Sequence, residues 1–351
     1  MSQCRISNLS DDLLHVILLK LLSTTAAGRT SVLSRRWRHV WASLPDLLLE
    51  NINAADSVDA ALAACSAPTA TRLAITMPLL FPNDLTTARV NPWLRFAAER
   101  RLAGELTLRL PRTVDAEGEI TLPLLEKVTR ITLTISSSTL RVLPTGGGTF
   151  ASLTVARITG ARMASRDIKR FGSARCPCLR TLELRGVSLV TGSEVSIRSE
   201  SLERLVLHVR IAGGRLELVT PRLQYLRAPA RCSMLLQATV VAPKLADLGW
   251  HVDYRREHHR FVEAGTHLRR LVITGKGGSM VPLLRRFHTV DELVLKSGDR
   301  QGTFIVGETE GKQKHAFAPS VLHLLRKLQG LRKLVLHLPL TNKFAVFASN
   351  V

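Results

Sequence analysis

Two cysteines separated by one residue are the first candidates for chemistry in this sequence. Cys176 and Cys178 flank a proline, and thiolates are good zinc ligands. A structural zinc site usually takes four ligands in two spaced pairs, and the sequence contains no second pair. We therefore predict two partly buried thiols beside the start of a repeated segment, with no metal.

Three histidines further along the chain raise the same question, because imidazole is a common metal ligand. His251 is followed by the adjacent pair His258 and His259. Adjacent side chains seldom face one metal, and nearby arginines disfavour a bound cation. These arginines are Arg255, Arg256 and Arg260. The sequence predicts solvated loop histidines rather than a metal site.

Catalytic motifs are also missing. The glycine clusters Gly146–Gly148 and Gly275–Gly278 lack the spacing of a P-loop and its Lys-Ser/Thr ending, so they predict turns. The sequence holds no serine nucleophile elbow and no acidic pair in a recognisable catalytic setting. We expect a protein that is not an enzyme and uses no cofactor.

Leucine spacing is the strongest pattern in the chain. The frame L-x-x-L-x-L, with other apolar residues allowed, starts at Val128, Phe150, Leu179, Leu202, Leu223, Leu245, Leu268, Val290 and Leu331. Most starts are separated by the period of leucine-rich repeats, about 20–29 residues. One frame cannot bury its apolar strand face alone, so neighbours must stack into a solenoid. We expect a curved parallel sheet whose convex side mixes short helices and extended segments.

The exposed positions of this frame are rich in arginine. The leucines point inward and the alternate residues lie on the concave sheet, because strand side chains alternate with a period of two. The candidate target-binding residues are Arg180, Arg204, Tyr225, Arg227, Arg269, Arg270, Arg332 and Lys333. Guanidinium groups suit carboxylate or phosphate, so we expect this face to bind an acidic or phosphorylated segment of a target protein. The alternative is that these charges only solubilise a leucine-rich surface.

An apolar segment near the amino end, Ile6–Leu49, must be positioned beside this array. From Leu13 to Leu22 only His15 and Lys20 are polar, whereas an ordinary surface helix keeps a polar face. Ser10 is an expected N-cap, followed by two aspartates that suit the first turn of a helix. The nearly all-round apolar surface predicts that part of this helix requires a partner.

The rest of this segment carries a family resemblance. SVLSRRWRHVWASLP resembles the F-box of plant F-box/leucine-rich-repeat proteins of the FBD-associated kind. The resemblance implies a three-helix unit that docks on a Skp-type adaptor, and through it on a cullin scaffold of a ubiquitin ligase. The implied adaptor contacts are Leu9, Leu14, Ile17, Leu21, Ala27, Val32, Ser34, Trp37 and Trp41. The family usually has Leu-Pro where this chain has Leu9-Ser10, so we expect weaker docking at that edge.

Charge and cysteine usage bound the possible partners and location. The formal net charge is +21, and most of the excess lies after residue 200, where it would attract acidic partners. No stretch approaches the ~18 uninterrupted apolar residues of a membrane span, and no secretory signal is present. The five cysteines are odd in number and scattered, which favours reduced thiols in the nucleus or cytoplasm.

These patterns predict an α+β or α/β chain in three parts: an F-box at 1–49, a linker and helical entry segment at 50–102, and an irregular leucine-rich-repeat domain at 103–351. The last part includes a surface insertion at 299–318 and an incomplete FBD-like end at 331–351. The predicted function is a non-catalytic substrate receptor of an SCF-type ubiquitin ligase. The alternatives are an F-box scaffold outside any ligase and a basic nucleic-acid-binding protein, the latter disfavoured because nucleic-acid motifs and aromatic platforms are missing.

Overall fold

The computed structural model describes residues 9–20, 35–78, 85–112, 118–136, 138–142, 148–210, 214–228, 235–252, 254–275, 277–297, 328 and 330–337. The chain divides into two compact units. Unit 1 comprises Met1–Arg170 and Ala174–Leu179, and unit 2 comprises Phe171–Ser173 and Arg180–Val351.

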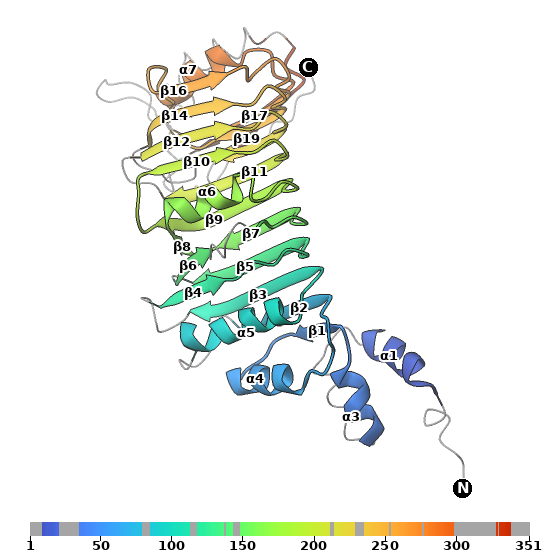
Figure 1. Cartoon of the computed structure of the whole chain (residues 1–351). Helices are drawn as coiled ribbons and strands as arrows, with labels where there is room; N and C mark the ends of the chain where they lie inside the picture. The colour runs from blue at the N-terminus through green and yellow to red at the C-terminus, as the bar shows by residue number, and fades with distance from the viewer. Residues whose placement is uncertain are drawn as a thin grey trace, which may run out of the picture. The chain divides into compact units, whose positions relative to one another are not determined.

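Unit 1 begins with two helices that pack together, α1 (Asp11–Lys20) and α3 (Arg35–Ala42) (Figure 1). The expected cap of α1 is confirmed, because Leu13 N–H donates to Ser10 Oγ at 3.4 Å. The two helices share a small core of Leu14, Leu18, Trp37, Val40 and Leu44. The residues between these two helices, 21–34, lie outside the described residues, so the structure describes two of the three expected F-box helices.

Parallel strands follow in unit 1 and pair in chain order. They are β1 (Asp46–Leu49), β2 (Arg72–Thr76), β3 (Glu105–Arg112), β5 (Arg130–Ser136) and β7 (Val155–Thr159). The last residues of the predicted F-box, 46–49, pair with β2 and form part of the sheet. Thr71 N–H donates to Pro45 O at 2.7 Å, which joins the end of the helical segment to the sheet.

Helices and a second set of strands connect these five strands or follow the last of them, β7. They are α4 (Ala55–Ala64), α5 (Thr87–Glu99), α6 (Ser165–Phe171) and the parallel strands β4 (Glu119–Leu122), β6 (Thr139–Val142) and β8 (Arg162–Met163). Helix α5 lies within the predicted helical entry segment at 50–102, and Pro92 lies inside this helix. The side chain of Asn91 holds α5 against β4, donating to Glu119 O at 2.9 Å and accepting from Thr121 N–H at 2.8 Å.

One of the predicted repeat frames is wrong. In β7, Ala156 pairs with Ile131 and Ile158 pairs with Leu133, so these are the inward residues of that repeat. The frame therefore starts at Leu153 rather than at Phe150. Phe150 is buried in the turn before the strand, where its N–H donates to Arg175 O at 2.8 Å. The prediction placed the start three residues too early, because the frame allows an apolar residue such as Phe150 at its first position.

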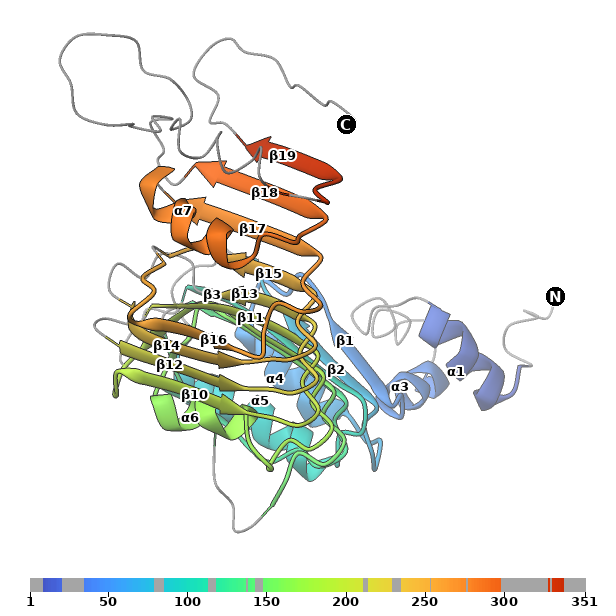
Figure 2. The same cartoon turned by 90° about the horizontal axis from the view of Figure 1, so that it is seen from above.

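Unit 2 contains two parallel sheets between which the chain alternates (Figure 2). The first sheet consists of β9 (Thr181–Leu189), β11 (Arg204–Arg210), β13 (Tyr225–Ala228), β15 (Asp247–Trp250), β17 (Arg270–Gly275), β18 (Glu292–Ser297) and β19 (Lys333–His337). The second consists of β10 (Glu194–Arg198), β12 (Gly214–Val219), β14 (Leu235–Val241) and β16 (His259–Val262). In the first repeats of unit 2, the segments that connect successive strands of the first sheet thus contain the strands of the second sheet.

The two sheets of unit 2 enclose an apolar core. Frame residues such as Leu205, Leu226 and Leu248 pair in register across the strands and are fully buried. Where the second sheet ends, helix α7 (Gly277–Arg286) packs beside β17, and Arg286 donates to Phe261 O at 2.7 Å. The segments that lead from one strand of the first sheet to the next are therefore strands in the earlier repeats of unit 2 and a helix after β17, which matches the expected mixture.

An aromatic cluster fills the wider part of this core. Trp250 packs edge-on against Phe261 and His259, with ring centroids 5.0 Å and 5.6 Å apart, and Phe261 contacts Phe287 at 5.3 Å. His259 is 2% exposed, and its Nδ1 accepts from Arg255 N–H at 3.2 Å. The prediction of a solvated His259 is therefore wrong, because β16 turns this side chain inward.

The other candidate ligands lie apart from one another. Cys176 is buried and Cys178 is exposed, and burial raises the pKa of the Cys176 thiol to about 12. Among the described residues, no group of three or more His, Cys, Asp or Glu side chains is placed to hold a metal ion. No described helix is long and apolar enough to cross a membrane.

Candidate functional site

The first candidate surface is an uncovered apolar face of α1. Leu13, Val16 and Ile17 are 50%, 49% and 39% exposed. Their spacing of three and four residues places them on one side of the helix, and we call them the α1 patch. Large apolar side chains that cluster on a surface mark interaction sites more often than single exposed ones do.

The predicted adaptor contacts divide into three groups in the structure. Leu14 and Trp37 lie in the core between α1 and α3, while Leu9 and Trp41 are partly buried and pack against that core. Ile17 alone lies in the α1 patch. The remaining four lie outside the described residues: Leu21, Ala27, Val32 and Ser34. Leu13 and Val16 were not among the predicted contacts, although the all-round apolar pattern of the helix included them.

Polar contacts fix α1 against α3 and so orient the α1 patch. Arg36 forms an ion pair with Asp11, at 2.6 Å between Nη2 and Oδ1, and donates to Leu9 O at 2.5 Å. On the neighbouring turn, His15 Nε2 lies 3.0 Å from Val40 O and 2.8 Å from Ser43 Oγ. Because these contacts flank the apolar core, α1 is held with Leu14 inward and its patch outward.

The second candidate surface is the face of the first sheet of unit 2 that points away from the second sheet. At the start of the strands, one row of side chains runs in register across this face. Its members are Thr181, Arg204, Tyr225, Asp247, Arg270, Glu292 and Lys333. We call it the charge ladder, because acidic and basic residues alternate at its carboxyl-terminal end.

Ion pairs connect neighbouring rungs of this ladder. Arg270 lies between two carboxylates, 3.6 Å from Asp247 and 3.2 Å from Glu292, and Lys333 lies 3.2 Å from Glu292. Opposite charges that face each other on adjacent strands stabilise a sheet by roughly 0.2–1 kcal/mol per pair. These cations therefore already have carboxylate partners within the protein.

Arg227 and Tyr225 form the most enclosed part of this face. Arg227 makes two hydrogen bonds to the Asp247 carboxylate, at 2.6 Å and 3.0 Å, and is 12% exposed. Its side chain lies across Gly249, where any Cβ would come within 2.2 Å of the arginine Cδ. Arg204 and Arg227 also lie against the Tyr225 ring, at 3.5 Å and 4.2 Å from its centroid. This cluster is packed before any partner arrives.

The structure brings together five of the eight predicted target-binding residues on this face: Arg204, Tyr225, Arg227, Arg270 and Lys333. The other three, Arg180, Arg269 and Arg332, precede their strands and are exposed. The backbone carbonyls of Arg180 and Arg269 accept hydrogen bonds from the following repeat. Binding of a target by any of the eight stays a prediction.

The same face carries a second row of side chains that the sequence analysis did not predict. It lies four residues beyond the charge ladder and contains Arg185, His208, His251, Thr274, Lys296 and His337. We call it the histidine row. His208 and His251 meet across β13, with ring centroids 6.3 Å apart, and His251 Nδ1 lies 2.7 Å from Thr274 Oγ1. Only His251 had been considered, and the alternation of strand residues could have identified the others.

A bulge in β9 lies beside this row. Between β9 and β11 the register shifts after the pair of Arg185 and His208, so that Gly186 has no opposite residue. Gly186 has a φ of 62°, which glycine adopts without the penalty of a side chain. Bulges of this kind redirect the side chains beside them, here those of Arg185 and His208.

His208 and His251 are less basic than an ordinary histidine. Burial lowers the pKa of His251 to about 4, with further lowering from His208, Arg227 and Lys296. Burial also lowers the pKa of His208, as does Arg185, while Glu183 opposes this. Both imidazoles are therefore neutral at pH 7 in a setting dominated by positive charge.

This pKa predicts acid sensitivity of unit 2. An unfolded His251 binds a proton near pH 6.5, whereas the folded one does so only near pH 4. Stability is therefore complete above pH 6.5 and falls as the pH drops toward 4, by up to about 3 kcal/mol. Urea unfolding at pH 7.5 and pH 5 should show this loss in the natural chain and a smaller loss in His251→Asn. The exposed His288 supplies the control variant His288→Asn; an equal pH dependence in all three proteins would refute the assignment.

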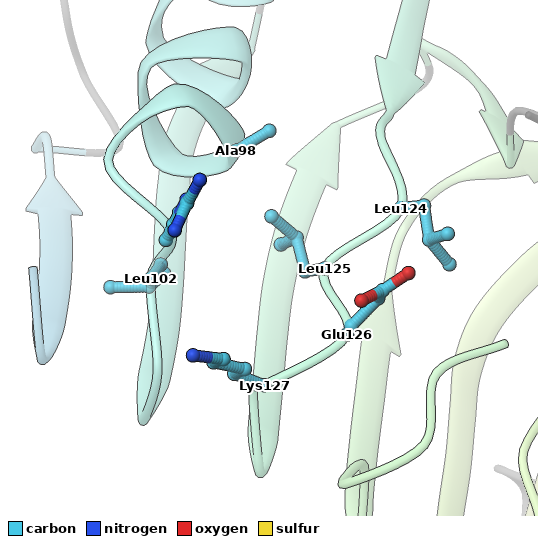
Figure 3. Close-up of a pocket in the computed structure, with 7 residues that line it drawn as sticks. Ala98, Leu102, Leu124, Leu125, Glu126 and Lys127 are labelled. Carbon is cyan, nitrogen blue, oxygen red and sulfur yellow. The ribbon is translucent and has the colours of Figure 1, made fainter. Parts of the chain in front are cut away.

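A shallow pocket of about 370 Å³ lies in unit 1 beside the end of α5 (Figure 3). Buried Leu102 and Leu125 form its apolar floor, and exposed Arg101 and Lys127 stand at its rim. Its volume is at the lower end of the range for ligand sites. None of the predicted site residues lines it.

Comparison with known proteins finds similar F-box proteins in a plant. No protein-family model and no solved structure matches the chain. An F-box protein of Arabidopsis thaliana is 28% identical over 71% of this chain and 78% of its own length. An F-box/LRR-repeat protein of the same plant is 39% identical over 28% of this chain. The chain is therefore similar to plant F-box and F-box/LRR-repeat proteins.

Other F-box relatives match shorter parts. F-box/LRR-repeat protein 25 of Arabidopsis thaliana is 56% identical over 45 residues, and an F-box/FBD/LRR-repeat protein is 55% identical over 49 residues. The matches to two of the F-box/LRR-repeat relatives span only 20% of those proteins' own length. One of these relatives matches most of this chain, and the others match shorter segments with higher identity.

Proposed function

We propose that this F-box/leucine-rich-repeat chain is a non-catalytic target-recognition subunit of an SCF-type ubiquitin ligase. The helices α1 and α3 bind a Skp-type adaptor, and the repeats bind a target protein. The observation that carries this proposal is the α1 patch, which remains uncovered although α1 has a complete core against α3. The F-box relatives support the same assignment.

The energetics of the α1 patch favour a protein partner. Burying apolar surface stabilises a complex by roughly 25 cal/mol per Å², and Leu13, Val16 and Ile17 are half exposed in the free chain. The patch is also preorganised, because Arg36 and His15 tie α1 to neighbouring groups. A rigid patch loses little conformational entropy on binding.

The repeats would contribute by holding a target close to the conjugating enzyme that the cullin carries. Such an arrangement accelerates ubiquitin transfer through proximity and orientation, and it requires no catalytic residue in this chain. The target-binding residues that we propose lie on the open face of unit 2, where Arg204, Tyr225 and Arg270 are brought together. We place this activity in the nucleus or cytoplasm, where thiols such as Cys65 and Cys176 stay reduced.

The variant Ile17→Asp tests the adaptor site. A carboxylate in the centre of an apolar contact must be desolvated without a partner, so adaptor capture should fall at least about 10-fold, equivalent to about 1.4 kcal/mol. The measurement is co-expression with a Skp-type adaptor followed by affinity capture of the complex.

The control makes the same change elsewhere. Val190 is 42% exposed in unit 2, so Val190→Asp should leave adaptor capture unchanged. Equal capture by the natural chain and Ile17→Asp would contradict the proposed site. Capture of adaptor without any cullin would instead identify a scaffold that acts outside a ligase.

A further inference from the structure

Charge is distributed unequally over the open face of unit 2. In the charge ladder, Asp247 and Glu292 alternate with Arg270 and Lys333, and each cation has a carboxylate within 4 Å. The predicted acid-binding cations of the ladder are thus largely neutralised by neighbouring repeats. Any excess positive charge that is available to a ligand must come from another part of the face.

The histidine row supplies that excess. Its members are basic residues and one hydroxyl: Arg185, His208, His251, Thr274, Lys296 and His337. The carboxylates around it are already engaged, since Glu183 accepts from Arg185 and Asp247 accepts from Arg227. Within the described residues, no carboxylate lies at ion-pair distance from Lys296. Among the described residues of this row, Lys296 therefore contributes a positive charge that no carboxylate neutralises.

Register places the donors around one point. Thr274 pairs with Lys296 on β18 and follows Ile273, which pairs with Trp250 just before His251. With adjacent strands about 4.8 Å apart, a group above Thr274 lies roughly 5 Å from the strands that carry His251 and Lys296. His208 reaches the same area from the far side of β13, in edge contact with His251.

We propose that His208, His251, Thr274 and Lys296 form the site that receives a phosphorylated side chain of the target. This inference rests on the proposed function, because it names the chemical group that the repeats select. A phosphate at pH 7 carries close to two negative charges and three acceptor oxygens, which matches one ammonium, one hydroxyl and imidazole N–H donors spread over neighbouring strands. A carboxylate carries one negative charge and two acceptor oxygens, and the two oxygens of Asp247 are already occupied by the two hydrogen bonds from Arg227.

The charged surroundings of the imidazoles support phosphate binding. His251 is faced by His208, Arg227, Thr274 and Lys296, and Asp247 near it is paired with Arg227. His208 is faced by Arg185 and Glu183. Burial and, to a lesser extent, nearby positive charges lower the pKa of both imidazoles. A bound dianion offsets those charges, so binding should take up protons. Affinity is then expected to rise as the pH is lowered from 7.5 to 6.5.

The test uses three degenerate peptide pools, each with random residues around a fixed central phosphoserine, aspartate or serine. The full chain, bound to its adaptor if the complex forms, is immobilised and pool capture is quantified. We expect the phosphoserine pool to be captured at least 10-fold better than the serine pool. Lys296→Met should remove most of this preference, and His208→Asn together with His251→Asn should remove its pH dependence.

A matched control separates this site from general electrostatics. Lys244→Met removes one exposed lysine from the loop before β15 and should leave the preference intact. Equal capture of the phosphoserine and serine pools, or an equal loss in Lys244→Met, would overturn the proposal. Equal capture of the aspartate and phosphoserine pools would overturn the assignment to phosphate. Adaptor capture by the same variants should not change, so a failure here is distinct from a failure of the ligase assignment.

Discussion

Replacing Trp250 by alanine is expected to destabilise unit 2 by about 3–5 kcal/mol, the usual cost of truncating a large core aromatic. Trp250 is fully buried on β15 and contacts the rings of His259 and Phe261 on β16. Its removal leaves a cavity between the two sheets that neighbouring repeats cannot refill, because β15 is held by parallel pairing with β13 and β17, and β16 by pairing with β14. Urea unfolding followed by circular dichroism measures the change.

The matching surface variant is Leu334→Ala. Leu334 lies on β19 and is 37% exposed, so its truncation should cost well under 1 kcal/mol. A similar small cost for Trp250→Ala would show that the aromatic cluster does not hold the sheets of unit 2 together.

Replacing Leu14 by alanine should destabilise the packing of α1 on α3 by about 2–5 kcal/mol. Leu14 is 1% exposed and belongs to the small core shared with Trp37 and Val40. Such a small core has little stability in reserve, so α1 should detach and adaptor capture should be lost. The repeats of unit 2 share none of these contacts and should unfold at an unchanged urea concentration.

Leu13→Ala is a control on the adjacent position. Leu13 is 50% exposed, so this variant should keep the stability of the α1–α3 core while weakening adaptor capture through loss of apolar contact. Helical content measured in both variants distinguishes the two effects. Equal stability of Leu13→Ala and Leu14→Ala would contradict the orientation of α1 described above.

Much of the repeat architecture could be predicted from leucine spacing. Frames such as those at Leu202 and Leu245 place Leu205 and Leu248 in the core, and both are fully buried. The spacing works because each strand buries the same alternate positions. The prediction fails for the frame that was placed at Phe150. The true frame begins at Leu153, and its second inward residue is Ala156, which is too small to stand out as a core residue in the sequence.

Contacts between repeats were less accessible to sequence reasoning. Arg227 and Asp247 are 20 residues apart, and only the register of β13 with β15 brings them together. The arginine positions were identified, but their neutralisation by the next repeat depends on that pairing. The histidine row has the same origin, because His208 and His251 meet across an intervening strand.

The orientation of α1 was also beyond the sequence. Leu13 and Leu14 are identical residues in an apolar run, and their pattern gives no reason to prefer one as the inward side chain. Packing against Trp37 decides this, burying Leu14 and leaving Leu13, Val16 and Ile17 uncovered. The sequence predicted only that some part of this helix requires a partner. The structure shows that the uncovered part is the face that carries Leu13, Val16 and Ile17.

The central claim is that a Skp-type adaptor covers the α1 patch. Amide hydrogen exchange of the full chain, measured with and without the adaptor, tests it most directly. The account predicts slower exchange in residues 11–20 and 35–42 when the adaptor is present, with the strands of unit 2 unaffected. Unchanged exchange in α1, or protection confined to the repeats, would contradict it.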